Sequence, residues 1–131
     1  MKKTRLINAP LSAVVATMGH TDRLAVADAG LPIPSGPARI DLAVTPGTPA
    51  FLDVLDAVLE ELVVEKAVCA VEIEEASPKM LKGIRERLGD VPIEFVPHEE
   101  FKRLCGGAKA VARTGECTPY ANVLLYSGVA F

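Results

Sequence analysis

The chain has 131 residues, half of them apolar, and a formal net charge of -3 at pH 7. This length fits one domain, residues 1–131, with a buried core. No basic run or aromatic pattern is present, which argues against a nucleic-acid partner. No apolar run reaches the length of a membrane span, and Asn8 and Pro10 interrupt the stretch where a signal peptide would be apolar. Three cysteines without a CxxC spacing indicate reduced thiols and a cytoplasmic protein.

The first predicted element is a helix that is capped by Asn8 and ended by Gly19, with Pro10 in its first turn. A short apolar run over residues 24–27 then predicts a buried strand. Residues 31–37 contain three prolines, each of which lacks a backbone donor and has a fixed φ. This segment is therefore expected to be an irregular loop.

A second strand is predicted from Ala38 to Val44. Thr48 is expected to cap the next helix, with Pro49 at its first position, because proline at this position sacrifices no helical hydrogen bond. Apolar residues recur along this helix at a spacing that places them on one face. They are Phe51, Leu55, Val58 and Leu62. This pattern indicates an amphipathic helix packed against a sheet.

The β-rich run from residue 63 to residue 71 is predicted as the central strand. Ser77 and Pro78 repeat the cap-and-proline start of a helix, which Gly89 is expected to close. Four further elements complete the chain. They are a strand at 93–96, a helix at 98–104, and strands at 109–113 and 123–127.

Strands that alternate with helices predict an α/β fold with three layers, in which helices cover both faces of a sheet. About six strands are expected, mostly parallel. The last two strands are joined by a short link, so at least one antiparallel pair is expected and the sheet is mixed.

Two histidines are candidates for proton-transfer chemistry. His20 comes just before the first strand and Asp28 just after it, which suits acid–base catalysis, although a lone loop histidine can equally be a surface or packing residue. Asp28 and His98 both follow strands, where sites gather in parallel sheets. The start of a helix favours neutral imidazole at His98, and Lys102 lies on the same helical face. The alternative is that His98 caps the helix and Lys102 is solvated.

Several common catalytic motifs are absent. The sequence contains no dinucleotide- or phosphate-binding glycine motif and no nucleophile elbow. The histidines and cysteines have unrelated spacings and include no local pair, so we expect no metal site. Cys117 has no histidine near it in the sequence and is expected to be a small packing residue.

Five blocks of the sequence form a more specific pattern. They are Gly19–Asp22, Asp28–Pro34, Arg39–Ala43, His98–Lys102 and Gly115–Asn122. Through these blocks the chain resembles the D-ribose pyranase family, a group of ribose mutarotases related to the fucose mutarotases, from residue 2 to residue 131. The Leu-Pro-Ile-Pro turn, the Arg-Ile-Asp strand and the second histidine have the ribose form rather than the fucose form.

This resemblance implies a function and a set of site residues. His20 matches the family's proton donor. The family's sugar-contacting positions match Asp28, His98, Tyr120, Ala121 and Asn122. The family interconverts β-D-ribopyranose and β-D-ribofuranose without a metal or organic cofactor. It assembles as a homo-oligomer, usually a decamer of two pentameric rings. The chain is therefore expected to be an isomerase of ribose metabolism with no cofactor.

The position of the Tyr120–Asn122 segment leaves two possibilities. This segment precedes its strand, whereas Asp28 and His98 follow theirs, so parallel strands would place them at opposite edges of the sheet. Either the last strand is antiparallel or a neighbouring subunit supplies the segment, and we favour the neighbour. Phe131 is expected to pack in the oligomer. The alternative functions are a fucose-type mutarotase, a non-catalytic sugar-binding or transport-accessory protein, and a purely structural oligomer.

Overall fold

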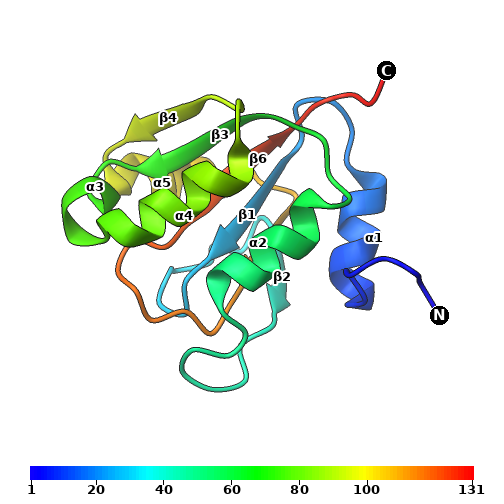
Figure 1. Cartoon of the computed structure of the whole chain (residues 1–131), viewed down its shortest axis with the longest axis horizontal. Helices are drawn as coiled ribbons and strands as arrows, with labels where there is room; N and C mark the ends of the chain where they lie inside the picture. Colours follow the sequence, from blue (N-terminus) through cyan, green and yellow to red (C-terminus); the bar gives the residue numbers. More distant parts are fainter.

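A six-stranded sheet in the order β2-β5-β1-β6-β3-β4 forms the middle of the computed structural model, which describes residues 1–131 (Figure 1). The strands are β1 (Arg23–Ala27), β2 (Ala38–Asp41), β3 (Val64–Ala70), β4 (Ile93–Val96), β5 (Ala110–Arg113) and β6 (Val123–Ser127). β5 is parallel to both β1 and β2, and β3 is parallel to β4. β6 runs antiparallel to β1 and β3 and so joins the two parallel groups into one mixed sheet.

The helices are α1 (Ala9–Thr17), α2 (Phe51–Leu59), α3 (Ile73–Ala76), α4 (Pro78–Leu88) and α5 (His98–Cys105). None of them combines the length and the apolar character that a membrane crossing requires. Alternate residues of β1 enter two separate cores. Leu24 and Val26 join the larger core, with side chains of α1, α2 and α4, and Ala25 and Ala27 join the smaller one, with Phe101 of α5. The predicted three-layer α/β/α arrangement is confirmed, with α5 behind the sheet in Figure 1.

Several predicted elements are confirmed at or near their bounds. The side chain of Asn8 accepts the N–H of Leu11 at 2.9 Å and so caps α1 as expected. α4 begins at Pro78, and Gly89 closes it with a φ of 57°, which glycine adopts without strain. β4 and β6 have the predicted bounds. Local signals therefore identify these elements correctly.

The predicted start of α2 is wrong. Thr48 does not cap this helix but lies ahead of it in a tight turn, which its backbone N–H closes by donating to the carbonyl of Thr45. The residue at the cap position is Ala50, and the helix begins at Phe51. The N–H of Phe51 donates to Glu116 Oε1 at 3.4 Å. A distant loop therefore supplies the acceptor that local capping would have provided.

Two predictions about the sheet are also wrong. β2 ends at Asp41 instead of Val44, since the Asp41 carboxylate accepts the N–H of Ala43 at 3.2 Å and turns the chain out of the sheet. β3 lies next to the edge strand β4, and the centre is occupied by β1 and β6. The expected antiparallel pairing is confirmed, although β6 pairs with β1 and β3 rather than with β5. The short helix α3 follows β3 and was not predicted.

Candidate functional site

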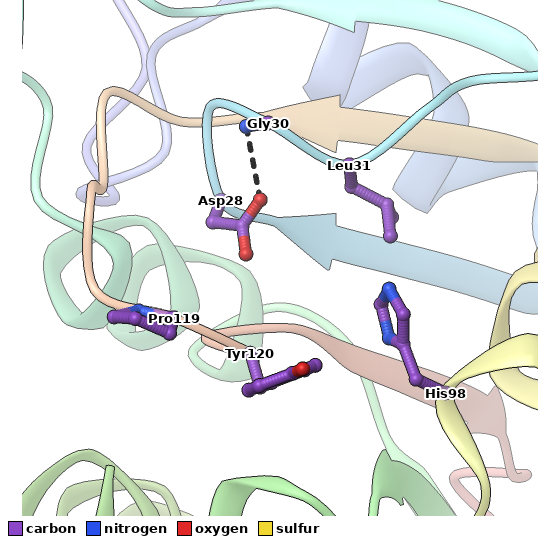
Figure 2. Close-up of a pocket in the computed structure, with 6 residues that line it drawn as sticks. All are labelled: Asp28, Gly30, Leu31, His98, Pro119 and Tyr120. Atoms are coloured by element: carbon purple, nitrogen blue, oxygen red, sulfur yellow. Dashed lines mark hydrogen bonds between the residues drawn. The ribbon is translucent and has the colours of Figure 1, made fainter. Parts of the chain in front are cut away.

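A cavity of about 290 Å³ opens where β1 and β4 end and β6 begins. Figure 2 shows the Asp28 carboxylate on one side of this cavity, the His98 ring on the other side and Tyr120 between them. The full lining consists of Asp28, Gly30, Leu31, His98, Pro119 and Tyr120. The rule that sites gather at the carboxyl ends of strands thus correctly predicted that Asp28 and His98 lie together.

Three hydrogen bonds to Gly30 and Asn122 hold Asp28 in place. Its Oδ1 accepts the N–H of Gly30 at 3.0 Å, the bond drawn in Figure 2. Its Oδ2 accepts a hydrogen bond from Asn122 Nδ2 at 2.9 Å, and its backbone N–H donates to Asn122 Oδ1 at 2.9 Å. Asn122 is 1% exposed. A buried carboxamide therefore fixes the direction of a carboxylate that lines the cavity.

The Tyr120–Asn122 segment belongs to the same chain as Asp28 and His98. β6 is antiparallel to β1, so the residues that precede β6 lie at the end of the sheet where β1 finishes. The prediction that a neighbouring subunit supplies this segment is wrong, and the antiparallel alternative is confirmed. Ala121 is fully buried in the larger core and does not line the cavity.

Tyr120 has an unusual backbone conformation. Its φ is 59°, in the left-handed region that non-glycine residues rarely adopt. This conformation places its ring edge-on to His98, with 5.1 Å between the ring centroids. The preceding carbonyl, that of Pro119, accepts a hydrogen bond from the Ser77 hydroxyl at 2.7 Å. Ser77 was predicted to cap α4, but its hydroxyl anchors the site loop instead.

His98 is the first residue of α5 and stands against a second acidic side chain. Its backbone N–H donates to Glu72 Oε1 at 3.0 Å. This hydrogen bond is the main cause that lowers the pKa of the Glu72 carboxyl below its usual range, and the charge of His98 acts in the same direction. Glu72 and Tyr120 also line an adjoining cavity of about 560 Å³. Glu72 therefore stands as a carboxylate directly behind His98.

Two further predicted site residues, in addition to Ala121 and Asn122, do not line the cavity. Lys102 forms a salt bridge with Glu99 at 2.7 Å on the surface of α5 and does not line the cavity, which agrees with the alternative of a solvated lysine. His20 lies at the opposite end of β1 from Asp28. A five-residue strand that rises about 3.3 Å per residue separates the two by about 15 Å or more. Nearness in sequence therefore did not bring His20 and Asp28 together within one chain.

His20 has its own acidic partner. Its Nε2 lies 2.9 Å from Glu65 Oε2, and its side chain is 55% exposed. The next residue, Thr21, has a φ of 69°, and its N–H donates to the carbonyl of Ser127. A residue with a left-handed backbone conformation therefore accompanies each histidine. Thr21 follows His20 in the sequence, and Tyr120 packs against His98 in the fold. Such conformations concentrate at functional sites.

Comparison with known proteins identifies the family of this chain. A sequence profile described as "RbsD / FucU transport protein family" matches residues 1–130. The chain belongs to this family. It is 56% identical to D-ribose pyranase of Lactiplantibacillus plantarum over the full length of both proteins. It is 53% identical to D-ribose pyranase of Geobacillus kaustophilus, over all of this chain and 96% of the relative.

Solved structures of the RbsD / FucU family share this fold. Bacillus subtilis RbsD complexed with D-ribose superimposes with a TM-score of 0.96, at 46% identity and full coverage of both chains. The fucose mutarotase of Streptococcus pneumoniae, in complex with L-fucose, gives a TM-score of 0.83 at 24% identity, also with full coverage. At this lower identity the second comparison supports the fold alone.

Glu72, which binds the backbone of His98, was not predicted from the sequence. A usable signal was present, since Glu72 follows the predicted strand at 63–71 just as Asp28 and His98 follow theirs. The partner of His20, Glu65, had no such signal, because it sits inside a strand and meets His20 only through the fold.

None of the cysteines lines the 290 Å³ cavity, although Cys117 and Asp28 both line an adjoining one. No group of three or more His, Cys, Asp or Glu side chains is arranged to hold a metal ion. Burial raises the pKa of the Cys69 and Cys105 thiols to about 12 each. Cys117 is exposed, so the expectation that it is a packing residue is wrong. What the site offers instead is a carboxylate, an imidazole and a phenol around a small cavity.

Proposed function

We propose that this chain is a sugar mutarotase that interconverts β-D-ribopyranose and β-D-ribofuranose. The observation that carries the proposal is the full-length match to RbsD complexed with D-ribose, at 46% identity and a TM-score of 0.96. The relatives named D-ribose pyranase support it at up to 56% identity. The cavity is small and combines apolar walls with a few converging polar groups, as sites for small molecules do.

The reaction needs only proton transfers. An acid protonates the ring oxygen O5 while a base removes the proton of the anomeric hydroxyl, and the bond between C1 and O5 breaks. The open-chain aldehyde then closes through O4, and the acid and base exchange roles. No covalent intermediate is required. General acid–base catalysis contributes about 10²–10⁴-fold, which suits a reaction that already proceeds slowly in water.

The cavity residues provide the sugar contacts in this proposal. Asp28 accepts a hydrogen bond from a sugar hydroxyl, and Asn122 acts through Asp28 by holding its carboxylate. His98, on the side opposite Asp28, and Tyr120, between the two, contact the sugar directly. Ala121 makes no contact with the sugar in this proposal, since it has no exposed surface.

His20 is the proposed acid, and it acts in the cavity of a neighbouring copy. An imidazole with an ordinary pKa of about 6.5 can give a proton in one step and take one in the next. His20 is exposed and at the far end of β1, so it can reach a cavity only across a subunit boundary. This arrangement fits a closed homo-oligomer, which we propose is a decamer of two pentameric rings.

The activity is tested by saturation-transfer NMR on D-ribose. The wild-type protein is expected to accelerate exchange between the pyranose and furanose signals, and His20→Asn is expected to abolish the acceleration. Full exchange with His20→Asn would exclude His20 as the acid. Exchange of L-fucose measured in parallel is expected to be much slower, and the reverse preference would favour the fucose-type alternative.

The shared site is tested by mixing inactive subunits. Co-expressed His20→Ala and Asp28→Ala chains restore an intact pair at about one site in four if each site combines two copies at random. Partial recovery of exchange to about that level is expected. No recovery in a mixed oligomer would show that each chain carries a complete site.

We further propose that the protein works in the cytoplasm and supplies furanose for ribose catabolism. Its three cysteines are unpaired, which suits a reducing compartment. Ribose arrives as a mixture of pyranose and furanose forms. Faster exchange between them helps when the next enzyme accepts only the furanose.

A further inference from the structure

Glu72 holds the first turn of α5 from outside that helix. It follows β3 and lies just ahead of α3, and its Oε1 accepts the N–H of His98 at 3.0 Å. The residue before the helix is Pro97, which has no side-chain donor or acceptor, and α5 has no side-chain cap of its own. The carboxylate of Glu72 therefore does the work of a cap.

Two polar atoms next to this hydrogen bond are buried without a partner. They are Glu72 Oε2 and His98 Nδ1. Buried polar atoms are nearly always paired, so each unpaired one calls for an explanation. His98 lines the cavity, and its other ring nitrogen, Nε2, is not among the buried unpaired atoms. The ring thus turns Nδ1 inward and leaves Nε2 for a ligand.

The two unpaired atoms match each other chemically. The Glu72 carboxylate makes no direct contact with Nδ1, but it is fixed on the backbone N–H of the same residue and acts on the ring through its charge. The lowered pKa of Glu72 keeps its carboxyl ionised, and an ionised carboxylate only accepts hydrogen bonds. Its negative charge favours a proton on Nδ1, whereas a lone pair on Nδ1 would face that charge.

We propose that Glu72 is a positioning residue that holds His98 in the tautomer with the proton on Nδ1, so that Nε2 presents a lone pair to the cavity. His98 then accepts a hydrogen bond from a sugar hydroxyl instead of donating one. The effect on ribose rests on the proposed function, while the tautomer itself does not depend on it. Carboxylates orient histidines in this way at many metal and catalytic sites.

The tautomer is read from the ¹⁵N shifts of the two ring nitrogens of the neutral His98 side chain. The chain has only two histidines, so the spectrum of His20→Asn assigns His98. In the wild type we expect a protonated Nδ1 and an unprotonated Nε2. Glu72→Gln keeps an oxygen for the N–H of His98 but removes the negative charge that favours a proton on Nδ1, so the proton is expected to move to Nε2. The same tautomer in both proteins, or a wild type protonated on Nε2, would overturn the proposal.

A second readout separates positioning from a structural role. Glu72→Gln is expected to raise the KM for ribose about tenfold, the loss of about one hydrogen bond, with a smaller effect on exchange at saturation. Glu74→Gln is the matched control, because Glu74 lines the same adjoining cavity but is exposed and has no contact with His98. In Glu74→Gln, the His98 tautomer and the KM for ribose are expected to equal those of the wild type. An inverted tautomer with unchanged KM would overturn the positioning role, whereas wild-type protein without ribose exchange would overturn only the proposed function.

Discussion

Asn122 uses both halves of its carboxamide on Asp28, one on the backbone N–H and one on the carboxylate. Asn122→Ala leaves both groups of Asp28 without these partners. We expect the free energy of unfolding to fall by about 2 kcal/mol, at about 1 kcal/mol per lost hydrogen bond. Ribose exchange should fall at least tenfold, because the Asp28 carboxylate loses its fixed direction. Denaturant unfolding and saturation-transfer NMR measure the two effects.

Asn122→Asp provides a sharper version of the same test. It places a second carboxylate against Asp28 Oδ2, where one of the two must take up a proton before a hydrogen bond can form between them. The shared proton raises the pKa of the pair, so stability should recover as the pH is lowered below the value at which the pair binds its proton. A variant whose stability relative to the wild type does not change with pH would contradict this account of the contact.

The three thiols differ sharply in expected reactivity. The pKa of about 12 keeps Cys69 and Cys105 protonated at pH 8, and both are buried. Only a thiolate reacts readily with iodoacetamide, so Cys117, which is exposed, is expected to be the single labelled residue of the native protein. Peptide mass spectrometry identifies the site. Cys117→Ser should abolish native labelling, and labelling of Cys69 before unfolding would be inconsistent with the structure.

At the scale of elements, Ser77 connects the start of α4 to the loop that carries Tyr120. Its hydroxyl donates to the Pro119 carbonyl at 2.7 Å, and the residue is buried. Ser77→Ala is expected to lower the free energy of unfolding by about 1 kcal/mol and to raise the KM for ribose several-fold. Thr17→Ala is the control, since the Thr17 hydroxyl donates only to the Val14 carbonyl within α1. If both variants raise the KM equally, the loop is not anchored through Ser77.

Sequence reasoning found the elements more reliably than their arrangement. The bounds of β4 and β6 follow from local apolar runs and turn residues, and these were predicted correctly. The strand order depends on which edges pair over long distances in the chain, and no local pattern encodes that β6 enters between β1 and β3. The error at Thr48 has the same origin, because the acceptor for the start of α2 is Glu116.

The candidate site shows the same division. The positions of Asp28 and His98 follow from the rule about the ends of parallel strands, and the structure brings them together. Tyr120 and Asn122 were named through family resemblance, and their place depended on the direction of β6. His20 was grouped with Asp28 because only eight positions separate them, but a strand between two residues moves them apart.

At the scale of the whole molecule, apolar side chains are exposed at the end of the sheet that carries His20. The N–H of Gly128 donates to the carbonyl of Val63, which places the C-terminal segment beside this end. The exposed apolar residues there are Val63, Val129 and Phe131. Exposed apolar groups of this kind mark contacts between proteins. This surface is therefore where we expect a neighbouring copy to dock.

Phe131→Glu tests this surface. A charge on a side chain that is buried between copies should shift the protein to smaller species in sedimentation velocity and, because His20 then reaches no cavity, should lower ribose exchange. Val44→Glu is the control, since Val44 is an exposed apolar residue in the loop after β2. Normal sedimentation of Phe131→Glu would exclude Phe131 from the interface.

The central position of β6 in the sheet also affects how the chain folds during its synthesis. β6 is the last strand to emerge from the ribosome, yet it separates β1 from β3 in the finished sheet. Until it arrives, the nascent chain holds two half-sheets whose inner edges are open, and such edges attract other strands. Asn122 arrives with it, so the carboxylate of Asp28 is held in place only once β6 has been made. The growing chain therefore exposes these two strand edges until β6 pairs with both of them.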